Sequence, residues 1–206
     1  MPLAPTLARS ASTAIRPLAG LVERLRTSGG AFALHETGAA ARPYLLAELY
    51  KATARQTFVV VPTADVAERT FADLLYYLGE SEAQSVALMR PRDENIGALE
   101  SPSERSARMS LLAQLCAGQP LIVVAPVAAL RQYLMPRALF ESSSFALETG
   151  RDAGFEATQT RLFRLGYHRV DVVSAAGEYA VRGGLIDLFA ATAERPTRIE
   201  FFGDEV

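Results

Sequence analysis

The sequence has little cysteine, histidine or lysine, and it contains no tryptophan. Its single cysteine, Cys116, cannot form an internal disulfide, and its apolar neighbours favour a buried, unreactive thiol over a reactive one. The two histidines, His35 and His168, do not stand at a spacing that builds a metal site with acidic or sulfur ligands. These shortages argue against a disulfide scaffold and against a metal centre.

An excess of positive charge is also missing. The net charge of −2 at pH 7 removes the simplest argument for nucleic-acid binding, because non-specific contact with phosphates requires a basic field. No apolar run approaches the ~18 residues of a membrane-spanning helix. The N-terminus lacks the apolar core of a signal peptide, although its arginine and serine content leaves a transit peptide conceivable. We expect a cytoplasmic protein with a flexible N-terminus over residues 1–17.

What the chain does contain is an alternation of apolar runs and helical periodicity over residues 18–139. Apolar runs at 31–34, 57–62 and 120–126 predict three strands, and the last two, apolar on both faces, are typical of central parallel strands. Helical segments are expected at 12–27, 44–54, 63–79, 101–116 and 127–134. This order predicts an open α/β sheet with helices on both faces.

Between the first expected strand and its helix, the sequence reads "LHETGAAAR" at 34–42, where a nucleotide-binding fold places its phosphate loop. A working loop needs glycines whose N–H groups approach the phosphates, a lysine, and a Ser or Thr for Mg²⁺. Only Gly38 is present, followed by Ala-Ala-Ala-Arg, and the first lysine is Lys51. Arg42 still offers a positive charge to an anion. We interpret the segment as a structural turn in a degenerate P-loop NTPase (RecA-like) domain without cofactor.

Near Phe140 the pattern changes to short strands with one helix. "FALETG" at 145–150, "DVV" at 171–173 and the runs beginning at 178 and 197 predict strands, whereas 155–166 predicts a helix that ends on Gly166. We therefore expect a separate small α+β domain over 140–206. The adjacent pairs Asp93-Glu94 and Asp204-Glu205 are interpreted as solvated surface charge, because neighbouring carboxylates do not converge on one substrate.

Three side chains in this second domain are expected on a polar face. Alternation along "TRIEFF" puts Arg198 and Phe202 opposite Ile199, and alternation along "YAVRG" puts Arg182 outward. If the two segments pair as a hairpin, all three residues share one surface. Gly183-Gly184 is a candidate bulge, which leaves the facing of Asp187 open. Phe202 is either an anchor for a protein partner or packs under another part of the chain, and the pattern does not separate these alternatives.

The stretches "GEYAVRGGLIDLF" and "RPTRIEFFGDEV" resemble the signature of the small domain shared by the excision-repair helicase UvrB and the bacterial transcription-repair coupling factors. The resemblance extends more weakly back to about residue 18. Two features favour the coupling factors. UvrB carries an intact phosphate loop, where this chain reads "TGAAAR", and "RPRDENIGALESPSER" resembles the shorter connection of the coupling factors, which lacks the DNA-clamping hairpin of UvrB.

The resemblance implies a UvrB-domain-2-like module that docks the damage-recognition ATPase UvrA. By position, it assigns the docking to Arg182, Arg198 and Phe202. It further implies that the intact family protein binds RNA polymerase and double-stranded DNA and uses ATP and Mg²⁺ in a motor beyond residue 206, so this chain looks like a non-catalytic fragment that recruits UvrA in nucleotide excision repair. The alternatives are the start of a UvrB-type helicase that binds ATP and damaged DNA, and a DNA-binding module.

Overall fold

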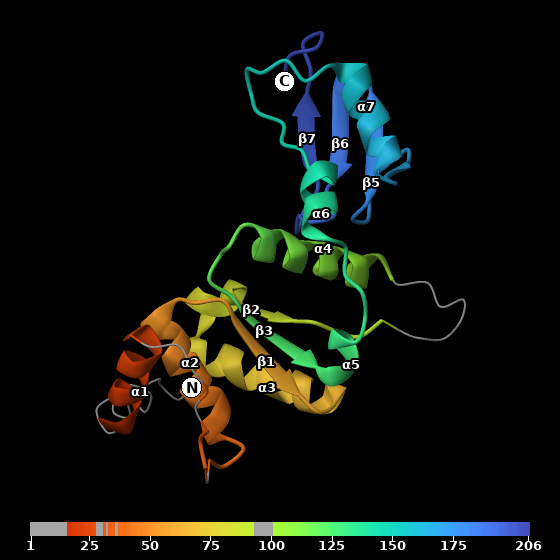
Figure 1. The fold of residues 1–206 in the computed structure, drawn as a ribbon. Coiled ribbons are helices and arrows are strands. Elements are labelled where there is room, and N and C mark those ends of the chain that lie inside the picture. Colours follow the sequence, from red (N-terminus) through yellow and green to blue (C-terminus); the bar gives the residue numbers. More distant parts are fainter. Residues whose placement is uncertain (1–15, 28–30, 32, 36, 93–100) are drawn as a thin grey trace, which may run out of the picture. The chain divides into compact units, whose positions relative to one another are not determined.

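The computed structural model describes residues 16–27, 31, 33–35, 37–92 and 101–206 (Figure 1). Most of the expected flexible segment, residues 1–17, lies outside this range, as do Asp93 and Glu94. The chain divides into two compact units, one within residues 1–88 and 120–127, the other within 89–119 and 128–206. Among the described residues, no helix is both long enough and apolar enough to cross a membrane.

The first unit is built on a three-stranded parallel sheet in the order β1-β3-β2. Its elements are α1 (Arg16–Thr27), α2 (Ala41–Thr53), β1 (Thr57–Val61), α3 (Ala64–Leu78), the 3-10 helix η2 (Glu80–Ser85), β2 (Val86–Leu88) and β3 (Ile122–Pro126). Strand β3 lies between the other two and is buried along its whole length, as expected for a run that is apolar on both faces. The predicted strands at 57–62 and 120–126 are thus confirmed.

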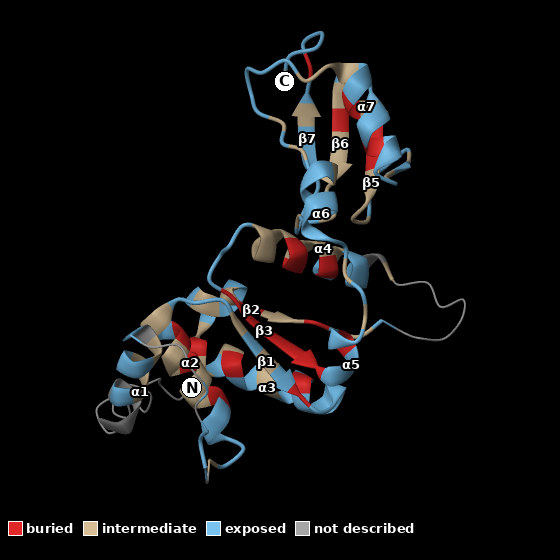
Figure 2. Ribbon diagram, in the orientation of Figure 1, coloured by how far each residue is buried: buried red, intermediate tan, exposed pale blue. Residues whose placement is uncertain are grey.

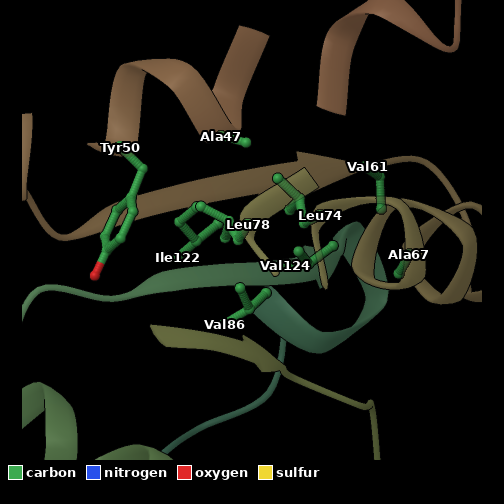
Figure 3. Close-up of a cluster of buried hydrophobic side chains, with 9 residues drawn as sticks. All are labelled: Ala47, Tyr50, Val61, Ala67, Leu74, Leu78, Val86, Ile122 and Val124. Atoms are coloured by element: carbon green, nitrogen blue, oxygen red, sulfur yellow. The ribbon is translucent and has the colours of Figure 1, made fainter. Parts of the chain in front are cut away.

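Helix α3 packs against all three strands, α2 packs against α3, and α1 against α2. The core of this unit is formed by side chains from α2, α3 and the three strands, shown in Figure 3: Ala47, Tyr50, Val61, Ala67, Leu74, Leu78, Val86, Ile122 and Val124. Thr63 caps α3 by accepting a hydrogen bond from the Val66 N–H at 3.4 Å, and Gly79 ends it. The apolar periodicity of 63–79 therefore predicted this helix correctly.

The expected strand at 31–34 is wrong for its described residues. Ala31, Ala33 and Leu34 are exposed and belong to no strand, consistent with the low strand preference of alanine. The third strand is β2 instead, which the sequence did not reveal because it has three residues and follows a 3-10 helix directly. The unit keeps a parallel α/β sheet, but with a different strand in it.

The second unit contains helices and a four-stranded sheet in the order β4-β5-β6-β7. Its elements are α4 (Pro102–Cys116), α6 (Arg137–Ser143), α7 (Phe155–Arg164), β4 (His168–Arg169), β5 (Glu178–Arg182), β6 (Leu185–Phe189) and β7 (Thr197–Glu200); α5 (Val127–Leu130) follows β3 in the chain. Strands β5, β6 and β7 form two antiparallel hairpins, and β4 adds in parallel to β5.

One face of this sheet packs against α7. The buried side chains are Leu162 from α7, Tyr179 and Ile186 from the strands, and Phe201, which follows β7. In Figure 2, buried positions on α7 alternate with exposed ones along the helix, as an amphipathic helix on a sheet requires. Phe155 and Phe201 meet edge to face with their ring centroids 5.3 Å apart. The opposite face carries charged side chains from all three antiparallel strands, together with the apolar Ala180 and Leu185.

Several expectations for this unit need correction. Residues 145–150 and 171–173 form no strand, whereas β4 (His168–Arg169) forms where no strand was expected. The segments containing Arg182 and Arg198 do not pair with each other, because β6 lies between them and pairs with both. Gly183-Gly184 is no bulge but a two-residue turn between the paired residues Arg182 and Leu185, with φ of Gly183 at 58°.

Candidate partner-binding site

The strand register places the three predicted residues on one face of the second sheet. Asp187 of β6 pairs with Ala180 of β5 and with Arg198 of β7, and the next row on the same face begins with Arg182. Phe202 continues the alternation of β7 two residues beyond Glu200. The structure therefore brings Arg182, Arg198 and Phe202 to the face that does not carry the core, although the predicted hairpin between their strands does not exist.

Arg198 is held by Asp187 in a two-pronged ion pair. Its Nε donates to Oδ1 at 2.6 Å and its Nη2 donates to Oδ2 at 2.9 Å. These hydrogen bonds lower the pKa of Asp187, and the positive charges of Arg198 and then Arg182 lower it further; the same pair raises the pKa of Arg198. The Arg198 side chain remains 62% exposed. The guanidinium is thus fixed in direction while the side chain as a whole stays largely open to solvent.

Arg182 is held differently. Its Nη2 donates to the backbone carbonyl of Asp171 at 2.9 Å. A carbonyl is neutral, so this contact orients the guanidinium without neutralising its charge. Among the ion pairs of the described residues, none involves Arg182.

Phe202 projects from the sheet next to a tight turn. Its side chain is 79% exposed, and its backbone pairs with Glu205 across Gly203 and Asp204. Asp204 anchors this turn through two sets of hydrogen bonds. Its Oδ1 accepts from the N–H of Phe155, the first residue of α7, at 2.9 Å, and its backbone carbonyl accepts from the N–H groups of Ala153 and Gly154. An exposed aromatic side chain on a backbone fixed in this way is typical of a protein-binding anchor.

The site contains two acidic residues whose roles the sequence did not show. The sequence does not determine which face Asp187 lies on, because a bulge at Gly183-Gly184 would reverse it; the structure has a two-residue turn there. Asp204 was interpreted as solvated charge, yet it caps α7 across 49 residues of sequence. The outward facing of Asp187 follows if Gly183-Gly184 is a two-residue turn and the apolar Ile186 faces the core. No local pattern indicates that Asp204 caps α7.

The segment that was compared with a phosphate loop precedes α2. Gly38 is exposed, and its carbonyl accepts from the Ala41 N–H at 3.1 Å in a short turn. Arg42 is exposed in the first turn of the helix, and no side chain caps the helix. Lys51 sits in the last turn, where its Nζ donates to Glu48 and to the carbonyl of Tyr77. The one lysine of the chain is therefore occupied away from this turn.

Other chemistry finds little support in the described part of the chain. It contains no group of three or more His, Cys, Asp or Glu side chains arranged to hold a metal ion. Cys116 is partly exposed rather than buried as expected, because it lies at the C-terminal end of α4.

Comparison with known proteins identifies the second domain and the family. Residues 145–206 match the model of the UvrB interaction domain. The chain is 37% identical over 169 residues to a transcription-repair-coupling factor of Bacillus subtilis (strain 168), covering 81% of this chain and 14% of that protein. It is 35% identical over 216 residues to the Mycobacterium tuberculosis (strain CDC 1551 / Oshkosh) protein of the same name, covering 92% of this chain and 16% of the relative.

The match to the UvrB interaction domain includes the whole four-stranded sheet and α7. The chain is therefore a protein that carries a UvrB interaction domain. The relatives share the sequence well beyond this domain, over most of the chain. The chain belongs to the family of transcription-repair coupling factors. It spans 14 to 16% of the length of these relatives.

Proposed function

We propose that this chain is a non-catalytic docking module that recruits UvrA in transcription-coupled nucleotide excision repair. The observation that supports this most directly is the exposed face of the UvrB interaction domain, on which Arg182, Arg198 and Phe202 are presented together. Arginine and aromatic side chains dominate the energetic centres of protein interfaces. In the intact protein, RNA polymerase, double-stranded DNA and ATP with Mg²⁺ would be bound by parts other than this domain.

The first unit fits a degenerate P-loop NTPase, RecA-like domain in this proposal. It has a parallel sheet and a turn before α2, but the turn has one glycine and no lysine or hydroxyl side chain at the positions that phosphate and Mg²⁺ require. Calorimetry with ATP and Mg²⁺ is expected to give no binding heat. Clear micromolar binding by this chain would instead support a UvrB-type helicase.

Binding to purified UvrA tests the docking role. Arg182→Ala, Arg198→Ala and Phe202→Ala should each weaken the binding of the full chain, with Phe202→Ala costing ~2 kcal/mol or more if it is a central anchor. If all three variants bind UvrA as tightly as the unaltered chain, this surface is not the docking site.

Matched controls lie on α7, which covers the other face of the sheet. Phe163 is 73% exposed, close to the value for Phe202, and Arg164 is also exposed. Phe163→Ala and Arg164→Ala remove the same side-chain types from the wrong face, so they should leave the affinity for UvrA unchanged. A loss in the controls equal to that of the site variants would show that the surface is not selective.

A further inference from the structure

The two arginines of the docking face are fixed by different partners. Arg198 is engaged by the Asp187 carboxylate through two hydrogen bonds, whereas Arg182 is engaged by the neutral carbonyl of Asp171 through one. A bidentate arginine–carboxylate pair fixes the plane of the guanidinium, while a single bond to a carbonyl does not. In the unbound protein, a carboxylate therefore balances the charge of Arg198 and fixes its side chain, whereas Arg182 is held by a single bond to a neutral group.

We propose that Asp187 is a positioning residue for partner binding: it holds Arg198 as an oriented hydrogen-bond donor, and Arg182, which forms no ion pair among the described residues, supplies the positive charge that meets a carboxylate on the partner. This inference rests on the proposed docking of UvrA. It assigns the partner an acidic group opposite Arg182 and an oxygen acceptor opposite Arg198.

The register explains why Asp187 is suited to this role. It lies directly opposite Arg198 in the β6–β7 ladder, at the distance where cross-strand side chains meet. Its side chain is 25% exposed against 62% for Arg198, so the carboxylate lies deeper and the guanidinium projects above it. The Arg198 side chain therefore stays largely accessible to a partner.

Prior fixation lowers the entropic cost of binding. A free arginine loses much rotamer freedom when a partner immobilises it, and a pair formed in the unbound protein has already lost that freedom. The pair is also close to neutral, so covering it with a partner removes less solvation than covering an isolated cation. Arg182 keeps its charge, which favours attraction to an acidic surface at longer range.

Kinetics of the full chain binding to immobilised UvrA tests the inference. Asp187→Asn keeps the size of the side chain but removes its charge, and it should raise the dissociation rate about threefold to tenfold, the range expected for releasing one ordered side chain. The association rate should not fall, because the surface becomes more positive. In an Arg198→Ala background, Asp187→Asn should have no further effect on the dissociation rate, which a general structural role would not produce.

Lysine substitutions separate the two arginines. Arg182→Lys keeps the point charge and should retain affinity within about threefold, whereas Arg198→Lys loses the bidentate geometry and should weaken binding as much as Asp187→Asn. Equal effects of the two lysine variants, or an unchanged or slower dissociation of Asp187→Asn, would overturn the inference while leaving UvrA docking intact. If the unaltered chain does not bind UvrA, the proposed function and the inference both fail.

Discussion

Asp187 makes the stability of the second sheet dependent on acid pH. Its pKa is held below the ordinary value of 3.8, chiefly by the hydrogen bonds from Arg198. A carboxylate whose pKa is lowered by folding stabilises the folded state fully above its ordinary pKa, and that contribution is lost as the pH falls through the lowered value. We expect the difference in unfolding free energy between the unaltered chain and Asp187→Asn to be constant near neutrality and to shrink below pH 3.8.

Urea unfolding at a series of pH values measures this difference. Asp171→Asn is the matched control, since the backbone carbonyl of Asp171, rather than its carboxylate, accepts the bond from Arg182. Asp171→Asn should therefore leave the bond from Arg182 in place. A difference for Asp187→Asn that stays the same down to the most acidic point would contradict the role of the Arg198 bonds.

Asp204 is expected to matter for stability more than an exposed loop carboxylate does. Its Oδ1 satisfies the first backbone N–H of α7, so Asp204→Ala leaves that donor without its acceptor and should cost ~1 kcal/mol, as for the loss of a helix cap. Glu205→Ala removes the neighbouring carboxylate and should cost much less. Thermal unfolding of both variants measures the difference, and equal midpoints for the two would refute the cap.

At this scale the sequence predicted the site only in part. Alternation within single strands placed Arg182, Arg198 and Phe202 outward without knowledge of the pairing, because the facing of a side chain depends on its own strand. Asp187 required the turn geometry at Gly183-Gly184, since a shift of one residue reverses every facing beyond it. The Asp204 cap depends on a contact between distant parts of the chain, which no local pattern contains.

Among the elements, α4 has the most complete start signal. Ser101 Oγ accepts from the Glu104 N–H, and Glu104 Oε2 accepts from the Ser101 N–H at 3.0 Å, with Pro102 in the first turn. Ser101→Ala should destabilise the helix by ~1 kcal/mol. Hydrogen exchange of the backbone amides in the first turn of α4 measures this loss of stability. Ser81→Ala, in η2, is the control and should change nothing in α4; unchanged protection in Ser101→Ala would contradict the capping box.

Elements were predictable where a long periodic segment carries its own boundaries. α3 has a cap and sustained apolar spacing, α4 has a capping box, and β3 is an apolar run that begins with three β-branched residues. The short elements escaped, because β2 and β4 owe their strand conformation to a neighbour rather than to their own residues. The strand predicted at 145–150 does not form, although its own residues favour one, because no neighbouring strand pairs with it. Instead, Phe145 packs against Arg161, whose guanidinium lies 4.4 Å from the ring centroid.

On the scale of the molecule, the docking face belongs to a domain with its own core. All members of the second core cluster, including the partly buried ones that surround it, fall between Phe145 and Val206. The family model begins and ends at the same residues. The three docking residues and their supports, Asp187 and Asp204, are in this range as well. If these residues bind UvrA as proposed, we expect recognition to require no side chain from the parallel sheet of the first unit.

A fragment covering residues 140–206 is accordingly expected to fold and to bind UvrA within about threefold of the full chain, while a fragment covering 1–139 should not bind. The expectation follows from the closed core, although a domain of this size buries a smaller fraction of its surface than a larger domain and is expected to be less stable. Circular dichroism establishes folding, and calorimetry measures affinity. A folded 140–206 fragment that does not bind UvrA would show that the first unit contributes contacts. An unfolded fragment would show that the second core needs α4, whose Ser106 Oγ donates to the Ala191 carbonyl at 2.6 Å.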